Sequence, residues 1–219
     1  MHRSEFPTSD DYPPVYVSEP QLLDLPPLRR IFLVGANGTY VVQLQADLFV
    51  LNWRKIPLDQ QYPHFESIKK QFLKHWQSFQ DFVRTFELGN LELTRYELAY
   101  INQFVEPQGS FPGALEKYTH LIHVRPPRPE HFLPPASNLA ADVRFIIPEG
   151  KGTLSVALKN GTRLKDKTDI LQLDVIARGD ARADGGDLVT WFDIAHTWIV
   201  KGFTELTSEE AHKTWGRTI

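Results

Sequence analysis

One long amphipathic helix constrains the fold of this chain more than any other feature. Between about His64 and Phe86, apolar residues recur at steps of three and four, which gathers their side chains on one helix face. The members of this stripe are Phe65, Ile68, Phe72, Trp76, Phe79, Val83 and Phe86. Pro63 suits the start of the helix, where its missing N–H costs nothing, and Gly89 suits the position after its end. A stripe about six turns long must be buried against a large surface, so we expect a sheet beside it.

Strands precede the helix and supply such a sheet. Residues 30–34, 39–44 and 48–53 predict three strands joined by short connections, which makes neighbouring strands antiparallel. Asn37-Gly38 separates the first two strands and is the strongest short hairpin signal, because both residues tolerate a positive φ. The segment therefore predicts a β-meander.

A strand with one apolar face follows the helix. In an extended run, Tyr96, Leu98 and Tyr100 point the same way, and Asn102 continues their face. We expect this strand to return to the sheet of the meander.

The second half of the chain repeats this order of elements. Strands are predicted over 142–148, 153–158 and 170–177, with turns at 149–152 and at Asn160-Gly161. A helix follows over 187–206, with Asp187 as its N-cap or in its first turn. Its apolar stripe is Leu188, Trp191, Ala195, Trp198 or Ile199, and Gly202 or Phe203. Thr207 and Glu210 have the spacing of a capping box for a last short helix that ends near Trp215.

These elements predict an α+β protein with two pseudo-repeated halves, each an antiparallel β-meander packed on one long amphipathic helix. A proline-rich extended arm over 1–28 precedes the first half, which spans 29–105. A Pro- and Gly-rich connection over 106–137, with a short strand over 118–124, leads to the second half over 138–219. The pattern leaves open whether the halves share one sheet or form two lobes.

Composition excludes several classes of function. The formal net charge of -3 disfavours a general nucleic-acid binder. The cations Lys159, Arg163, Lys165 and Lys167 alternate with Asp166 and Asp169, which is typical of a solvated hairpin. The absence of cysteine excludes disulfides, thiolate metal sites and a Cys nucleophile. No secretory signal, membrane-length apolar stretch or nucleotide-binding motif is visible, so we expect a cytoplasmic protein without membrane association, cofactor or metal.

Several short motifs carry a family resemblance that covers about residues 40–215. They are Val42-Gln43-Leu44-Gln45, Leu51-Asn52-Trp53-Arg54, Tyr62-Pro63-His64-Phe65-Glu66, Leu98-Ala99-Tyr100-Ile101-Asn102, and His196 followed by Phe203-Thr204-Glu205-Leu206-Thr207. In this order the chain resembles a sporadically distributed family of prokaryotic proteins with no assigned activity. Pro13-Pro14-Val15 is only an approximate counterpart of the strand that often opens members of that family. The patchy distribution of the family is typical of mobile or defence-associated genes.

The sequence offers two sets of candidate site residues. The first set consists of polar or aromatic groups on strand faces that could form the floor of a ligand pocket: Asn52, Arg54, Tyr100 and Asn102. Alternatively, the two amides hydrogen-bond to neighbouring backbone and only fix the fold. Asp193 and His196 lie three apart on the last long helix, so their side chains can meet. His196 could act as a catalytic base that Asp193 orients, or the two residues could form a structural pair. His120 and His123 also lie three apart, but on a strand they would point to opposite faces, so we expect no metal site there.

Three functions follow as hypotheses. The favoured one is a non-enzymatic protein-interaction module, an accessory, inhibitor or antitoxin-like component of a defence-associated operon. Its partner would be another protein or a second copy, as five Trp and fourteen Phe residues permit. The first alternative is a small-ligand-binding domain with a pocket between a curved sheet and its helix. The second is a hydrolase or nuclease that uses His196.

Overall fold

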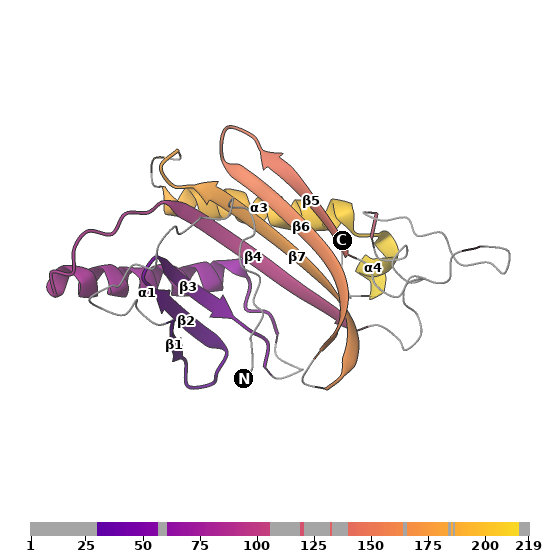
Figure 1. Cartoon of the computed structure of the whole chain (residues 1–219), viewed down its shortest axis with the longest axis horizontal. Coiled ribbons are helices and arrows are strands. Elements are labelled where there is room, and N and C mark those ends of the chain that lie inside the picture. The colour runs from indigo at the N-terminus through magenta and orange to yellow at the C-terminus, as the bar shows by residue number, and fades with distance from the viewer. Residues whose placement is uncertain are drawn as a thin grey trace. The chain divides into compact units, whose positions relative to one another are not determined.

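The computed structural model describes residues 30–56, 61–105, 119, 120, 132, 140–163, 166–183, 185 and 187–214. The chain divides into two compact units, 1–76 and 77–219. Two antiparallel sheets, of three and four strands, and a few helices make up the fold (Figure 1). The predicted α+β class is therefore confirmed. No helix within the described ranges is long and apolar enough to cross a membrane.

The first unit contains the predicted meander. Strands β1 (Ile31–Val34), β2 (Tyr40–Gln45) and β3 (Leu48–Trp53) form a sheet in the order β1-β2-β3. Gly38 adopts a φ of 70° in the β1–β2 turn, and the side-chain oxygen of Asn37 accepts a hydrogen bond from the N–H of Thr39 at 3.1 Å. The hairpin predicted at Asn37-Gly38 is therefore present.

Helix α1 (Phe65–Thr85) begins and ends within one residue of the predicted bounds. Within the first unit, its aromatic stripe packs on β3: the Phe49 ring lies 5.8 Å from the Phe72 ring and 5.3 Å from the Trp76 ring, between centroids. Phe65 and Trp76 are buried. The apolar spacing thus identified both the helix and the face that it buries.

The end of α1 differs from the prediction. Glu87, not Gly89, is the first residue after the helix in the left-handed region, with a φ of 52°. The N–H of Glu87 donates to the carbonyl of Arg84 at 3.2 Å and the N–H of Leu88 donates to the carbonyl of Val83 at 3.0 Å, the two bonds of a Schellman motif. The prediction that glycine ends the helix was wrong because the turn tightens two residues earlier, with a glutamate in the position that glycine usually takes.

The second unit contains the larger sheet. Its strands are β4 (Arg95–Val105), β5 (Ala140–Ile147), β6 (Gly152–Arg163) and β7 (Thr168–Asp180), in the order β4-β7-β6-β5. The expectation that the strand after α1 returns to the meander was wrong, because β4 pairs with β7. This ladder runs without a break from Arg95 opposite Asp180 to Val105 opposite Ile170, a length that the six-residue strands β2 and β3 cannot offer.

The turn predicted at Asn160-Gly161 was also wrong. Strand β6 runs straight through both residues and remains paired with β7, and the chain reverses near Lys167, which has a φ of 58°. Gly161 has no positive φ, so its conformation is one that other residues adopt as well. Ladder pairing over the whole length of two long strands outweighs the local turn preference of an Asn-Gly pair.

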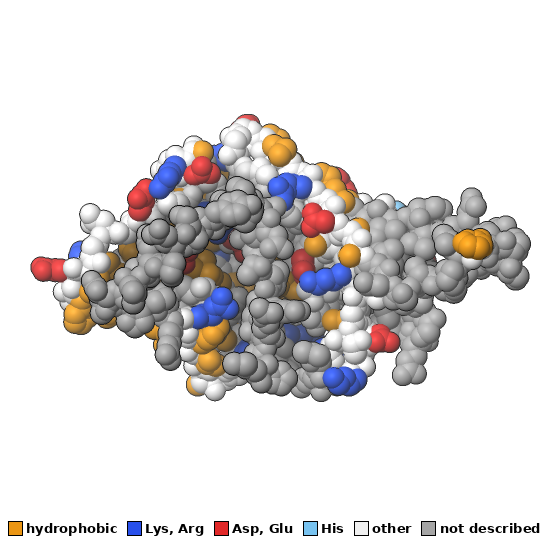
Figure 2. Space-filling view, in the orientation of Figure 1, with side chains coloured by type: hydrophobic (Ala, Val, Ile, Leu, Met, Phe, Trp, Pro, Cys, Tyr) orange, Lys and Arg blue, Asp and Glu red, His pale blue; other side chains and the backbone are white. Residues whose placement is uncertain are grey.

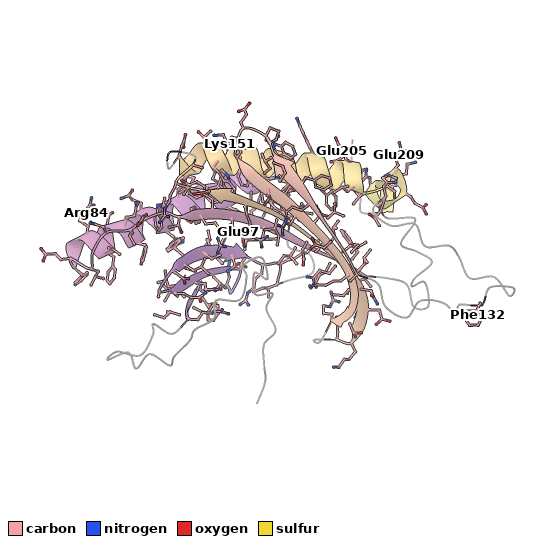
Figure 3. The ribbon with its side chains drawn as sticks, turned by 45° about the horizontal axis from the view of Figure 1, so that its top comes forward. Arg84, Glu97, Phe132, Lys151, Glu205 and Glu209 are labelled. Carbon is pink, nitrogen blue, oxygen red and sulfur yellow. The ribbon has the colours of Figure 1, made fainter. Side chains whose placement is uncertain are left out.

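Helix α3 (Leu188–Leu206) lies across one face of this sheet (Figure 1). Trp191, 1% exposed, anchors the first turn of the helix: the indole N–H donates to the Lys151 carbonyl at 3.0 Å, and the ring lies 5.2 Å from that of Tyr96. Figure 3 shows Lys151 at the end of the sheet where α3 begins. The buried residues of the helix are Trp191, Phe192, Ala195 and Ile199, which selects Ile199 over Trp198.

The N-cap predicted for α3 is confirmed, whereas the cap predicted for the last short helix was wrong. Asp187 is the N-cap of α3, since its carboxylate accepts from the N–H of Thr190 at 3.1 Å. Thr207 is the C-cap of α3, and the N-cap of α4 (Glu209–Thr214) is Ser208, whose hydroxyl accepts from the N–H of Ala211 at 3.0 Å. The predicted capping role of Thr207 was wrong because its hydroxyl donates to the carbonyl of Phe203.

Parts of the predicted domain plan lie outside the described residues. They are the arm over 1–28 and most of the connection over 106–137. Of the strand predicted over 118–124, Thr119 and His120 are described, and Thr119 forms an isolated antiparallel bridge with Thr207. The proposed domain boundaries therefore stay predictions.

Candidate functional site

Asn52 and Arg54, the candidates of the first unit, lie on the outside of the small sheet. Both side chains are exposed. Arg54 pairs with the β1–β2 turn: its Nε donates to the Gly38 carbonyl at 2.8 Å, and its backbone N–H donates to the Thr39 carbonyl at 2.9 Å. Arg54 thus holds the turn in place, whichever other role it has.

Tyr100 and Asn102, the candidates of the second unit, lie on the face of β4 that α3 covers. The Asn102 amide donates to the Leu173 carbonyl on β7 at 3.3 Å. The Tyr100 ring lies 6.2 Å from the imidazole of His196, between centroids. The structure therefore brings together a residue from each candidate set, Tyr100 and His196, in a contact that links the sheet to α3.

Asp193 and His196 lie on α3, as the helical spacing requires. Asp193 is exposed, and its backbone carbonyl accepts from the hydroxyl of Thr197 at 2.9 Å. His196 is half-buried beside Tyr100. An imidazole in this place packs on an aromatic ring, and its use in hydrolysis stays a prediction.

A buried hydroxyl–imidazole pair, which the sequence analysis missed, lies where α3 meets α4. The Thr207 Oγ1 is 2.7 Å from the Nε2 of His212, and Thr207 and His212 are both buried. The hydroxyl has one proton and donates it to the Phe203 carbonyl, so the imidazole Nε2 must donate to Thr207. His212 therefore cannot act through Nε2 as the base for this hydroxyl, and the pair fixes the junction of the two helices.

A row of polar side chains, also missed, crosses the sheet face opposite to α3. Gln103 Nε2 donates to Gln172 Oε1 at 3.2 Å, and Gln172 Nε2 donates to the two carboxylate oxygens of Asp174 at 2.8 and 3.0 Å. Lys159 Nζ lies 3.6 Å from the same carboxylate, which is 8% exposed. The row spans β4, β7 and β6, so its bonds join three strands. Gln172 and Asp174, two polar residues in an otherwise apolar run from Ile170 to Ala177, were the available signal.

The basic hairpin between β6 and β7 carries paired charges. The Arg163 guanidinium binds the Asp166 carboxylate through Nε at 2.9 Å and Nη2 at 2.6 Å. This hydrogen bonding lowers the pKa of Asp166 well below its usual range and raises the pKa of Arg163. In the part of the chain that the structure describes, no three His, Asp or Glu side chains gather in a way that could hold a metal ion.

Exposed apolar side chains surround the end of α1. Phe82 and Phe86 lie with their rings 4.8 Å apart, and Leu88 and Leu91 are exposed nearby in sequence. A shallow hollow of about 510 Å³ lies beside them, lined by residues between Gln80 and Leu91. Charged side chains interrupt this surface, among them Arg84, which is paired with Asp81 and points away from the helix in Figure 3.

Strand β1 forms a second exposed apolar surface, at the edge of the small sheet. All of its side chains are exposed: Ile31 by 40%, Phe32 by 50%, Leu33 by 56% and Val34 by 56%. Figure 2 shows hydrophobic side chains over the β1–β2 hairpin. Such a run usually predicts a strand that is buried on both faces, because four consecutive apolar residues leave neither face polar.

The backbone of β1 has a free side as well. The N–H of Gly35 donates to the Tyr40 carbonyl at 2.9 Å, which makes these two residues a hydrogen-bonded pair of the ladder. Because bonded and non-bonded pairs alternate in an antiparallel ladder, Leu33 and Ile31 also bond to β2, whereas the peptide groups of Phe32 and Val34 point away from it. No strand among the described residues pairs with β1 on that side.

Searches of protein-family models, curated proteins and solved structures found no match to this chain. Strand β1 differs in charge from the edge strands of the larger sheet. The edge strands of the larger sheet carry charges, Arg95 and Glu97 on β4 and Asp142 and Arg144 on β5, whereas β1 carries none. Charges on edge strands discourage pairing with another chain. β1 lacks this protection.

Proposed function

We propose that this chain is a non-enzymatic protein-interaction module that adds a strand of a partner protein to the edge of β1. The observation that carries the proposal is the exposure of all four apolar side chains of β1, between 40% and 56%, on an edge with outward peptide groups. In strand addition, main-chain hydrogen bonds supply affinity, and alternate side chains supply specificity. β1 offers both kinds of contact to an extended segment.

The apolar surface at the end of α1 is the weaker candidate. It has exposed Phe82 and Phe86 rings, but the charged residues Asp81, Arg84 and Glu87 lie close to them in the sequence, and the hollow beside it is shallow. A helix has no outward backbone donors along its length, so this surface would bind through side chains alone. β1 adds directional hydrogen bonds to apolar contact.

The biological setting is part of the proposal. The resemblance to a sporadic prokaryotic family supports an accessory, inhibitor or antitoxin-like component of a defence-associated operon. We also propose the pseudo-repeat, in which β1–β3 with α1 corresponds to β5–β7 with α3; the shared order of an antiparallel meander and a long helix supports it.

The alternative functions have less support. A pocket floored by Asn52, Arg54, Tyr100 and Asn102 would need side chains that are available to a ligand. Arg54 bonds to Gly38, and Asn102 bonds to Leu173. Hydrolysis by His196 would need a nucleophile, and His196 packs on the ring of Tyr100.

The experiment uses two variants at one position. Val34→Pro removes an outward N–H that β2 does not use, while Val34→Thr keeps the N–H and the β-branched shape. Tagged wild-type chain and both variants are expressed in the native host, and stable complexes are resolved by native mass spectrometry. We expect wild type and Val34→Thr to retain the same partner and Val34→Pro to lose it. Retention of the partner by a folded Val34→Pro variant would refute strand addition at β1.

A further inference from the structure

We infer that the strand added to β1 is β1 of a second copy, so that two chains form one continuous six-stranded sheet around a two-fold axis. The inference rests on the proposed strand-addition function and names its partner. It follows from the symmetry of the edge itself: an antiparallel copy of β1 presents the same outward groups, in the reverse order, to the first.

The outward groups fix the register of the two copies. Only Phe32 and Val34 point their peptide groups away from β2, so these residues must form the hydrogen-bonded pairs. When Leu33 lies on the two-fold axis, Phe32 of each copy faces Val34 of the other. This register satisfies the N–H and C=O of both residues on both chains.

The side chains fit the same arrangement. Ile31, Phe32, Leu33 and Val34 would cover one another on the two faces of the joined sheet, and cross-strand apolar and aromatic pairs stabilise antiparallel ladders. In this register Arg30 faces Ala36 of the other copy, so no two like charges are opposed. Because β1 carries no charge, β1 of a second copy can pair with it without electrostatic repulsion, just as an uncharged strand of another protein could.

The length of β1 limits the strength of the dimer. Stable interfaces bury about 1,200–2,000 Å² in total, and a pair of four-residue strands buries less. We therefore expect a dimer that forms reversibly with a Kd of about 1 μM or weaker. Dimer should appear as the chain is concentrated and disappear on dilution.

The absence of cysteine from the chain allows a direct test of the register. A Leu33→Cys variant has one thiol, placed on the two-fold axis in a non-hydrogen-bonded pair, where facing Cα atoms lie about 4.5 Å apart. Disulfides form between Cα atoms about 4.4–6.8 Å apart. In Phe32→Cys and Val34→Cys the equivalent residues of the two copies are offset by two positions along the strand, beyond this range.

The full-length variants are oxidised at several concentrations, and covalent dimer is measured on non-reducing gels and by mass spectrometry. We expect Leu33→Cys to cross-link at least ten times faster than Phe32→Cys and Val34→Cys. Sedimentation should show dimer for wild type at about 100 μM and monomer for Val34→Pro. Wild type that stays monomeric, or equal cross-linking at the three positions, would overturn the second-copy partner.

The two proposals can fail separately. A monomeric wild type that still retains a foreign partner through β1, and loses it in Val34→Pro, overturns the inference and leaves the proposed function standing. A Val34→Pro variant that keeps both dimer and foreign partner overturns both proposals. Circular dichroism of each variant checks that the fold is retained.

Discussion

Gly179 of β7 is the residue that allows Trp191 to pack on the sheet, and its replacement by alanine tests the core of the second unit. A Cβ at position 179 would lie 2.1 Å from Nε1 and 2.5 Å from Cε2 of Trp191, well inside van der Waals contact. The indole is 1% exposed and cannot move outward without losing its place. Gly179→Ala therefore forces a shift of more than an ångström in Trp191, the residue that anchors the first turn of α3.

The expected magnitude follows from two costs. Overpacking a core by one methyl group costs about 1–3 kcal/mol. The shift also breaks the bond from Trp191 Nε1 to the Lys151 carbonyl, 3.0 Å long, and a buried polar group that loses its partner costs about 1–3 kcal/mol more. We expect Gly179→Ala to lower the free energy of unfolding by about 2–5 kcal/mol.

Urea unfolding of the full chain, followed by tryptophan fluorescence and circular dichroism, measures this loss. Gly161→Ala is the matched control: it lies in β6, has no positive φ, and a Cβ there would meet nothing within 4 Å. The control should be neutral or slightly stabilising. Trp191→Phe removes the clashing nitrogen, so the double variant should be less destabilised than the sum of the single variants. A Gly179→Ala variant as stable as Gly161→Ala would refute the packing described for Trp191.

Three further predictions concern helix ends. Glu87→Gly should raise the free energy of unfolding by about 0.5–1 kcal/mol, because glycine tolerates the φ of 52° at this position, and chemical unfolding measures the gain. Gly89→Ala should lower the free energy of unfolding, because alanine is strained at the φ of 103°. Ser208→Ala should cost about 1 kcal/mol in the same assay through loss of the α4 N-cap; no change in stability would contradict the assignment of the cap to Ser208. Hydrogen bonding to Thr190 lowers the pKa of Asp187 in the folded protein. The ionised carboxylate therefore stabilises the fold at pH values above the pKa of Asp187 in the unfolded chain, and this stabilisation is lost as the pH falls through the pKa of Asp187 in the folded protein. Asp187→Asn keeps the cap, and thermal melts between pH 2 and 6 should show a weaker pH dependence than wild type; an unchanged dependence would contradict the cap.

Periodicity was enough to predict most elements, because it reflects burial on one face of a helix or strand. The stripe from Phe65 predicted α1 within a residue at each end, and the alternation from Tyr96 predicted β4 and its inner face. The partner of β4 could not be predicted in this way, because alternation says which face is buried but not which strand lies alongside. The same limit explains why the turn at Asn160-Gly161 was wrongly predicted: the local pattern did not show that β7 stays paired with β6 past these two residues.

Functional surfaces were harder to predict than elements. Ile31–Val34 has the composition of a buried strand, and only the three-dimensional sheet shows that it is an exposed edge. Asn102 was correctly singled out, in one of two interpretations, as an amide that ties down neighbouring backbone, and the structure identifies its partner as Leu173. The bond from Arg54 to the Gly38 carbonyl was not predicted. The pair of Thr207 and His212 depends on the meeting of two helices, which no local pattern encodes.

Amide hydrogen exchange of β1 in the dilute, uniformly ¹⁵N-labelled full chain tests most directly the claim that this edge is open to a partner. Leu33 donates to β2 and should exchange slowly, whereas the outward N–H groups of Phe32 and Val34 should exchange rapidly in the monomer and become protected when a partner strand is added. If Phe32 and Val34 were as protected as Leu33 in the dilute monomer, β1 would already be paired, and strand addition at this edge would be excluded.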